Sequence, residues 1–432
     1  MIVPSSYGAL SATSANVIQG RAPIFTVQYG AKRLGFTVNG TYYSESEGNL
    51  SSTDDNLFDA GLTPNDFHVI TLTANDFTVQ DDYYDADGDE AHPSTPFTVG
   101  SISYTWKDRT GKTLSKNDKK KMIGCGGNLK LPLTLTINLS NVQLHSKYGN
   151  PKYSAPRILK RNYKIMATQG ICFARPGSLD WFDMGTGATR HSTKGGGYTT
   201  DFVPNYGFKA DPTVSSEKFP TTAFRGARFQ LVMTGSQTDW NYSVITNPNG
   251  AVTVDTINGW VTINNKPTGT IKVRATSKNT SNIYFDYAFT PTSLWVVPKP
   301  RNPVNIDGEY SYVEAKTACG DVSKIPSREQ LSNSPYSRIG QGASIPSNAS
   351  TRAIGKLEIS GGAQPMKESI FSEWGMSEGG SNGTYPDSRW DRSLYWTRDE
   401  YLPGTPFLVT SDRGDVDWSK ALYSCYQVAC LE

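Results

Sequence analysis

The C-terminal stretch 310–430 constrains the fold more than any other part of the sequence, because cysteines lie near both of its ends. Cys319 follows aromatic and small residues at helix-like spacing. A proline-containing turn then leads to Ser327, a residue type that commonly caps a helix N-terminus. Cys430 lies in the last predicted strand. A cysteine in the first helix and another in the last strand can join the two ends of one domain.

Length and composition favour several β-rich domains. A chain of 432 residues predicts about three domains, and 40 Gly, 25 Pro and 11% aromatic residues suit many short strands joined by turns. The net charge of +2 gives no reason to expect nucleic acid or an anionic membrane as a partner. No apolar run approaches the ~20 residues of a membrane helix, so no membrane insertion is expected.

The first part of the chain predicts a β-sandwich with long loops. Residues 24–29 and 34–38 have strand composition, whereas the polar residues 44–56 indicate a mobile loop. A later strand ends in Tyr104-x-Trp106, a layout that resembles the immunoglobulin-like repeats of bacterial surface adhesins and implies that Trp106 faces inward. Cys125 and Cys172 flank further apolar segments, and a bridge between them would contribute about 4 kcal/mol in the chain-entropy model. The alternative is two free buried cysteines.

A second candidate feature of this region is a group of three carboxylates. Asp85, Asp87 and Asp89 have the first three spacings of a calcium loop. The twelfth position is Pro96 instead of Glu, which excludes an EF-hand. A turn whose Asp side chains accept backbone N–H bonds is the main prediction, and a weak calcium site is the alternative.

Residues 178–212 are rich in Gly, Ser and Thr and predict a loop or linker. From Phe219 onward, alternating strands recur at the regular spacing of a second β-sandwich up to Phe289. Trp295 lies in a short apolar connection to the C-terminal stretch and predicts a rigid junction, because it needs burial between two domains.

Four features of the C-terminal stretch resemble the C-type-lectin-like domain at the tip of the intimin/invasin adhesins. They are Ala315-x-x-x-Cys319, Ile325-Pro326-Ser327 with Glu329 and Leu331, Tyr395-Trp396-Thr397, and the terminal aromatic-x-Val-Ala-Cys430. The segment from Phe219 to Phe229, with the strands that follow it, is similar to the penultimate immunoglobulin-like domain of the same family. The alternative is a disulfide-closed α+β domain without lectin ancestry.

The resemblance implies a mainly β chain in which tandem immunoglobulin-like β-sandwiches precede a C-terminal α+β C-type-lectin-like domain. We expect an N-terminal β segment at 1–58, a sandwich at 59–212, an invasin-type domain at 213–299 and the lectin-like domain at 300–432. The first-to-last cysteine pairing of the family implies a Cys319–Cys430 bridge and leaves Cys425 spare. A Cys319–Cys425 bridge is the competing pairing.

Receptor contacts are expected on loops of the lectin-like domain. The Gly/Ser-rich segment 375–390 is a candidate recognition loop. Because exposed Trp, Tyr and Arg side chains commonly anchor binding surfaces, the candidates are Trp374, Tyr385, Trp390 and Arg392, with Tyr385 and Trp390 expected to be exposed. The calcium motif of sugar-binding relatives is replaced by Gln364-Pro365-Met366, so a protein receptor is expected rather than a glycan.

The sequence argues against an enzyme. Gly375–Gly379 and Gly379–Gly383 both fit G-x-S-x-G, but the histidine that must follow the serine in an α/β-hydrolase is missing, since His191 is the last one. No cofactor is expected.

We therefore expect a secreted or surface-exposed bacterial adhesin, associated with virulence, that binds a host receptor through its tip. The alternative is a secreted interaction protein that binds a bacterial partner and modulates virulence. Residues 1–6 do not form a signal peptide, and the outer-membrane barrel of the full-length adhesins is not expected. Export or anchoring would then need an outer-membrane partner.

Overall fold

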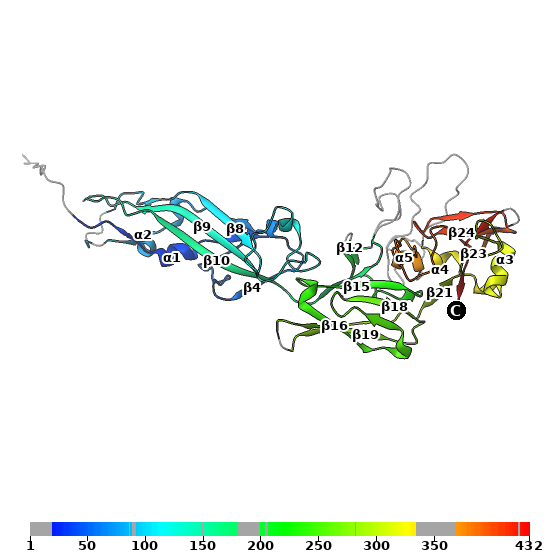
Figure 1. Cartoon of the computed structure of the whole chain (residues 1–432). Coiled ribbons are helices and arrows are strands. Elements are labelled where there is room, and N and C mark those ends of the chain that lie inside the picture. Colours follow the sequence, from blue (N-terminus) through cyan, green and yellow to red (C-terminus); the bar gives the residue numbers. More distant parts are fainter. Residues whose placement is uncertain are drawn as a thin grey trace, which may run out of the picture. The chain divides into compact units, whose positions relative to one another are not determined.

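The computed structural model describes residues 20–85, 87–88, 92–148, 150–179, 199–203, 206–280, 282–333, 369–421 and 424–432. The chain divides into two compact units (Figure 1). Unit 1 comprises residues 1–123 and 129–167, and unit 2 comprises residues 124–128 and 168–432. The mainly β architecture expected from the sequence is confirmed.

Unit 1 is built on one sheet with two long central strands, β9 (Leu133–Leu144) and β10 (Arg157–Ala167). Strands β7 (Phe97–Thr98) and β8 (Ile102–Lys107) both pair with β9. Strand β4 (Asp55–Phe58) pairs with β10 and runs parallel to it. Alternate side chains of a strand point to opposite faces. One face of this sheet is therefore apolar and buried, and it includes Trp106, which faces inward as predicted.

The segments before β7 cover that apolar face. Tyr163 of β10 donates a hydrogen bond to the Leu34 carbonyl at 2.5 Å and packs edge-on against Phe36. These segments form two helices, α1 (Val27–Lys32) and α2 (Val79–Asp82), and five short strands: β1 (Ile24–Phe25), β2 (Phe36–Val38), β3 (Thr41–Tyr43), β5 (His68–Val69) and β6 (Tyr83–Tyr84). Short 3-10 helices occur at Pro64–Asp66, Ala74–Asp76 and Asp118–Lys120.

Two predictions for this region are wrong. Residues 24–29 do not form one strand, because the chain turns into α1 after Phe25 and buries Ala31. Residues 1–58 are not a separate segment, because β4 hydrogen-bonds to β10 more than a hundred positions further along the chain. Local alternation did not reveal that parallel pairing.

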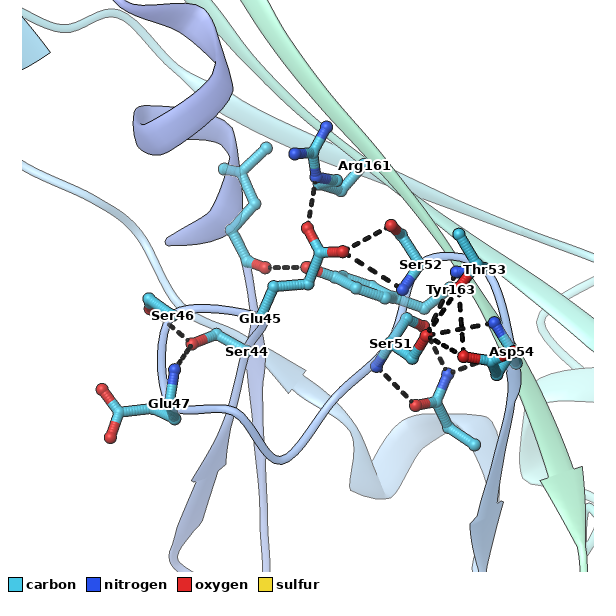
Figure 2. Close-up of polar contacts among 12 residues, drawn as sticks. Ser44, Glu45, Ser46, Glu47, Ser51, Ser52, Thr53, Asp54, Arg161 and Tyr163 are labelled. Atoms are coloured by element: carbon cyan, nitrogen blue, oxygen red, sulfur yellow. Dashed lines mark hydrogen bonds and ion pairs between the residues drawn. The ribbon is translucent and has the colours of Figure 1, made fainter.

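Residues 44–56 form a hydrogen-bonded turn structure instead of the mobile loop that we predicted (Figure 2). Glu45 is its centre, because its carboxylate binds the Arg161 guanidinium at 2.6 Å and accepts hydrogen bonds from Ser52. Burial opposes ionisation of Glu45, but the hydrogen bonds from Ser52 and Arg161 outweigh it and lower the pKa of the carboxyl.

Unit 2 begins with a β-sandwich. Its larger sheet has the order β12-β13-β11-β15-β18-β17, and its smaller sheet has the order β16-β19-β20. The strands are β11 (Ile171–Pro176), β12 (Phe202–Val203), β13 (Gly207–Lys209), β15 (Ala227–Met233), β16 (Trp240–Thr246), β17 (Val252–Val254), β18 (Trp260–Ile263), β19 (Ile271–Ser277) and β20 (Tyr284–Phe289). Short 3-10 helices lie at Gln237–Asp239 and Pro248–Gly250.

The predicted boundary at residue 212 does not coincide with the edge of this sandwich. β11 pairs antiparallel with β15, and β13 continues the same sheet, so part of the predicted linker 178–212 is strand. The glycines at 195–197 lie outside the described residues. Cys125 and Cys172 form a disulfide, and both cysteines belong to unit 2 instead of the preceding sandwich.

A three-stranded sheet with the order β14-β21-β27 joins the sandwich to the C-terminal part of unit 2, residues 300–432, which we call the tip. β21 (Leu294–Pro298) runs parallel to β14 (Thr222–Ala223) on one side and antiparallel to β27 (Ala429–Leu431) on the other. Trp295 on β21 is 7% exposed, as the predicted rigid junction requires.

The tip combines three short helices with short sheets. The helices are α3 (Tyr312–Cys319), α4 (Arg328–Leu331) and α5 (Ile370–Trp374), and a 3-10 helix lies at Val322–Lys324. The strands are β22 (Tyr310–Ser311), β23 (Leu394–Leu402), β24 (Thr405–Thr410), β25 (Val416–Trp418) and β26 (Cys425–Tyr426). A Cys319–Cys430 disulfide ties α3 to β27, and Cys425 is free and exposed.

Candidate functional site

Three of the four residues that we predicted to contact a receptor are buried. Trp374 and Tyr385 have no exposed surface, and Trp390 is 1% exposed. The prediction that Tyr385 and Trp390 are exposed is wrong because Phe224 of the sandwich packs edge-on against both of them and against Trp374. These aromatic side chains fill the junction between sandwich and tip.

The same junction holds a buried carboxylate. Glu373 on α5 accepts hydrogen bonds from the backbone N–H and the hydroxyl of both Thr221 and Thr222. Its Oε2 lies 3.0 Å from the Thr221 nitrogen and 2.9 Å from both the nitrogen and the hydroxyl oxygen of Thr222. The Trp374 indole donates to the Thr222 carbonyl at 3.2 Å. Complete burial raises the pKa of Glu373 to about 7, although the threonine hydrogen bonds oppose the shift.

Arg392 is the one predicted contact residue at the surface, where it binds Asp412 at 3.2 Å. The predicted recognition loop 375–390 is folded back on itself: Gly379 donates to the Trp390 carbonyl at 2.7 Å, and Tyr385 donates to the Glu378 carbonyl at 2.9 Å. Most of this loop therefore supports the junction.

A different part of the tip forms an open groove with a volume of about 530 Å³. One wall is helix α4. Ser327 caps it by accepting from the Gln330 N–H at 3.2 Å, while its own N–H donates to the Gln330 side chain at 2.8 Å. This reciprocal pair fixes the start of the helix, so Arg328 and Glu329 stand at a defined position. The lining residues are Ser327, Arg328, Glu329, Gln330, Arg398, Asp399, Tyr401 and Phe407.

The opposite wall comes from the hairpin of β23 and β24. Pairing between these strands shifts register between Trp396 and Glu400, which marks an irregular segment. Such irregularities redirect side chains and are common beside functional sites. Here Asp399 accepts from the Arg328 N–H at 2.6 Å, and Arg398 donates through its backbone to Pro326 and through its side chain to Ser323.

Aromatic rings form the rest of the groove. Tyr401 stacks on Trp418 at 5.5 Å with an angle of 17° between the ring planes, and its edge meets Phe407. The Arg328 guanidinium lies 5.6 Å from the Phe407 ring centre. Arginine and aromatic side chains beside carboxylates favour recognition of a protein segment over chemistry on a substrate. The sequence analysis treated Ser327 and Glu329 as helix signals and did not predict that Arg328 and Arg398 line the same groove.

The other sequence candidates carry no chemistry in the described residues. Asp85 and Asp87 accept backbone N–H bonds, from Asp87 and Arg21, as expected for a turn. Asp89 and the motif Gln364–Met366 lie outside the described residues. In the described ranges no three His, Cys, Asp or Glu side chains could hold a metal ion. Ser377 is fully buried and donates to the Gly375 carbonyl, so it is not an accessible nucleophile.

Residues 203–289 match the family model described as invasin, domain 4. This range runs from β12 to the end of β20 and therefore includes most of the sandwich of unit 2. A comparison with curated proteins gave no match. None of the helices in the described part of the chain is long and apolar enough to cross a membrane.

Solved structures of invasin and of intimin are similar to the chain. The crystal structure of invasin, described as a bacterial integrin-binding protein, shares 15% identity over 78% of this chain with a TM-score of 0.36; the match spans 59% of the invasin chain. A C-terminal 282-residue intimin fragment in complex with the intimin-binding domain of its translocated receptor shares 12% identity over 78% of this chain and all of the fragment, with a TM-score of 0.34. An EHEC O157:H7 intimin mutant shares 16% identity over 54% of this chain and 94% of that one, with a TM-score of 0.29.

The architecture of unit 2 defines a β-sandwich protein that carries a disulfide-closed, lectin-like α+β tip with a groove at its surface. The domain-4 match confirms the resemblance to the intimin/invasin adhesins over the segment that it covers. The sandwich of unit 2 thus contains a domain of the invasin domain-4 type.

Proposed function

We propose that this chain is a bacterial adhesin, secreted or exposed on the cell surface, whose tip binds a receptor protein on a host cell through the groove between α4 and the β23–β24 hairpin. The observation that carries the proposal is the meeting of Arg328, Arg398 and Tyr401 in one open site. The proposal is for binding without catalysis. Attachment to the producing cell would use a separate export or anchoring partner.

A rigid base supports this assignment. The groove walls come from segments far apart in the chain, and the Arg328–Asp399 hydrogen bond joins them. The tip that carries them is tied to the sandwich by β21 and closed by the Cys319–Cys430 disulfide. A preorganised surface loses less conformational entropy on binding, so a groove of this kind suits firm attachment.

A protein receptor fits the groove better than a glycan. Arginine and tyrosine are typical anchors of protein interfaces, and the groove offers both positive and negative groups to an extended partner segment. A receptor segment with a carboxylate near Arg398 and an apolar or aromatic group against Tyr401 and Phe407 would complement these groups.

The test is binding of the full chain to host cells, with Arg398→Glu as the probe and Arg389→Glu as the matched control. Both arginines lie in the tip, and Arg389 is exposed on the segment that packs at the junction. Loss of a central contact should weaken cell binding by about tenfold or more, and the control should bind as the parent does.

Equal loss in both variants would point to net charge instead of the groove. Unchanged binding by Arg398→Glu would exclude the groove as the contact. Recovery of a protein from the producing bacterium, with no binding to host cells, would support the alternative of a secreted protein that acts on a bacterial partner.

A further inference from the structure

Opposite charges are separated along unit 1. Residues 41–90 contain 13 Asp and Glu and no Lys or Arg, whereas residues 101–170 contain 14 Lys and Arg and two acidic residues, Asp108 and Asp118. Both of those acidic side chains are already engaged by neighbours in their own turns. The overall charge of the chain hides this separation.

The fold places the acidic stretch on one side of the sheet and the lysines of the strands β8 and β10 on the other, whereas the loop helix Asp118–Lys120 lies beside Pro64–Asp66 of the covering segments. The acidic stretch belongs to the segments that cover the apolar face, where Tyr163, Leu135 and Trp106 are buried. The other face is polar and uncovered within unit 1. In-register rows run across it from Ser103 to Asn138 to Lys160, and from Lys107 to Thr134 to Lys164.

Few carboxylates of unit 1 neutralise the positive charge of the lysines on this outer face. Lys107, Lys160 and Lys164 are exposed, and none of the three forms a salt bridge within the described residues. Asp55 lies opposite Lys164 in the β4–β10 pairing, and Asp54 interacts with Lys164 electrostatically. These two carboxylates lie at the β4 edge beside Lys164, so Lys107 and Lys160 are left without an acidic partner in the described part of unit 1.

The covering layer is acidic at its surface. Arg161, which points to the inner face, is paired with Glu45, and Glu47 points away from that network toward solvent (Figure 2). Arg33 binds both the exposed Asp81, at 3.2 Å, and the buried Asp82, at 3.1 Å, so these three side chains together keep a net negative charge. Glu47 and Asp81 therefore add negative charge on the side of unit 1 that is opposite the lysines.

We propose that the outer sheet face of unit 1, with Lys107, Lys160 and Lys164, binds the acidic covering layer of unit 1 in a second copy of this chain. Unit 1 holds 17 Lys and Arg against 15 Asp and Glu. A nearly neutral body with separated charges has little long-range attraction for a polyanion, but it is complementary to a copy of itself. Because the two contacting faces differ, the contact is head-to-tail and leaves a free face at each end.

The association should depend strongly on salt. A single exposed ion pair contributes little to the free energy of association. The contact therefore depends on several charges that act together over the distance at which salt screens electrostatic interactions. That length is about 30 Å at 0.01 M salt and about 10 Å at 0.1 M. Sedimentation of the full chain at these two salt concentrations should show concentration-dependent species larger than a dimer at the lower one and largely monomer at the higher one.

Two charge variants test the faces separately. The first, Lys160→Gln with Lys164→Gln, neutralises exposed side chains of the outer face. The second, Glu47→Gln with Asp81→Asn, neutralises the covering layer and leaves the Arg33–Asp82 pair intact. Each variant alone should sediment as a monomer at low salt. An equimolar mixture should form dimers and no larger species, because each partner retains one working face. Far-UV circular dichroism checks that both variants fold.

The proposal is overturned if the parent chain stays monomeric at low salt, or if either variant associates as the parent does. Binding of the parent to a heparin column, lost in the lysine variant, with no self-association would identify a polyanion as the occupant instead. Cell binding of the lysine variant should equal that of the parent, so failure of this contact is distinguishable from failure of the groove in the tip.

Discussion

The junction and the groove of unit 2 use the same kinds of residue for opposite purposes. At the junction, Trp374 and Tyr385 are enclosed by the sandwich, and Glu373 is saturated by threonine donors. In the groove, Tyr401 and Arg398 face an open volume, and Asp399 holds the two walls together. The difference lies in the neighbours: Trp374 is enclosed by Phe219 and Phe224, whereas Tyr401 packs on Trp418 and remains partly open to solvent.

The largest loss of stability should come from removing a buried aromatic ring at the junction. Trp374→Ala removes a fully buried ring and should lower the free energy of unfolding of unit 2 by about 3–5 kcal/mol. Tyr401→Ala in the groove should lower it by less than half as much, because that ring is only half-buried. Urea unfolding of both variants measures the contrast. Similar losses would mean that the two aromatic groups do not differ as described.

Removing the tip disulfide should have the next largest effect. Cys319 and Cys430 are 111 positions apart, and loss of such a bridge typically costs about 2–5 kcal/mol. Chemical unfolding of Cys319→Ser with Cys430→Ser should show this loss, whereas Cys425→Ser, which removes a free exposed thiol, should unfold as the parent does. A stable tip without the bridge would show that the junction alone holds it.

Acidification should stabilise the junction through Glu373. Its pKa in the folded state is about 7, above the ordinary value of 4.5, so the folded protein binds the proton more tightly than the unfolded chain. The free energy of unfolding should therefore rise by at most about 3 kcal/mol as the pH falls from about 7 to about 4.5. Below that pH this contribution should stay constant. Glu373→Gln should lose this part of the pH dependence. Parallel pH profiles in parent and variant would refute the assignment.

The smallest effect should come from the N-cap of the groove helix. Ser327→Ala removes the acceptor for the Gln330 N–H and should cost about 1 kcal/mol. Because α4 carries Arg328, the same variant should weaken receptor binding more than its small stability loss suggests. The control is Ser323→Ala, at an exposed position in the 3-10 helix that precedes α4. If both variants bind the receptor equally well, the N-cap of α4 does not affect the groove.

Much of the fold could be predicted because its signals are local. The alternating strands from Phe229 to Phe289, the inward Trp106 and the cap at Ser327 depend on nearby residues. The resemblance also implied the Cys319–Cys430 bridge, which the structure contains.

What could not be predicted depends on residues distant in the chain. Polar neighbours made Tyr385 and Trp390 resemble surface residues, yet Phe224, more than 150 positions earlier, packs against both. The groove was missed for the same reason, because Arg328 and Arg398 are brought together by hydrogen bonds from the Arg398 N–H to Pro326 and from the Arg328 N–H to Asp399. Likewise, nothing near β4 in the chain indicates its parallel partner β10. The predicted domain boundaries at residues 58 and 212 failed for this reason, since strands on either side of each boundary pair with each other.

The double pairing of β21 has a mechanical consequence. If the bound tip is pulled, tension along β21 acts in shear on its ladder with β27, whose antiparallel hydrogen bonds lie across the strands and must break together. Beyond that ladder, the Cys430 sulfur passes the pull covalently to α3. An attachment of this design would resist flow best when the force runs along the strands, and it would yield sooner to a peeling force across them.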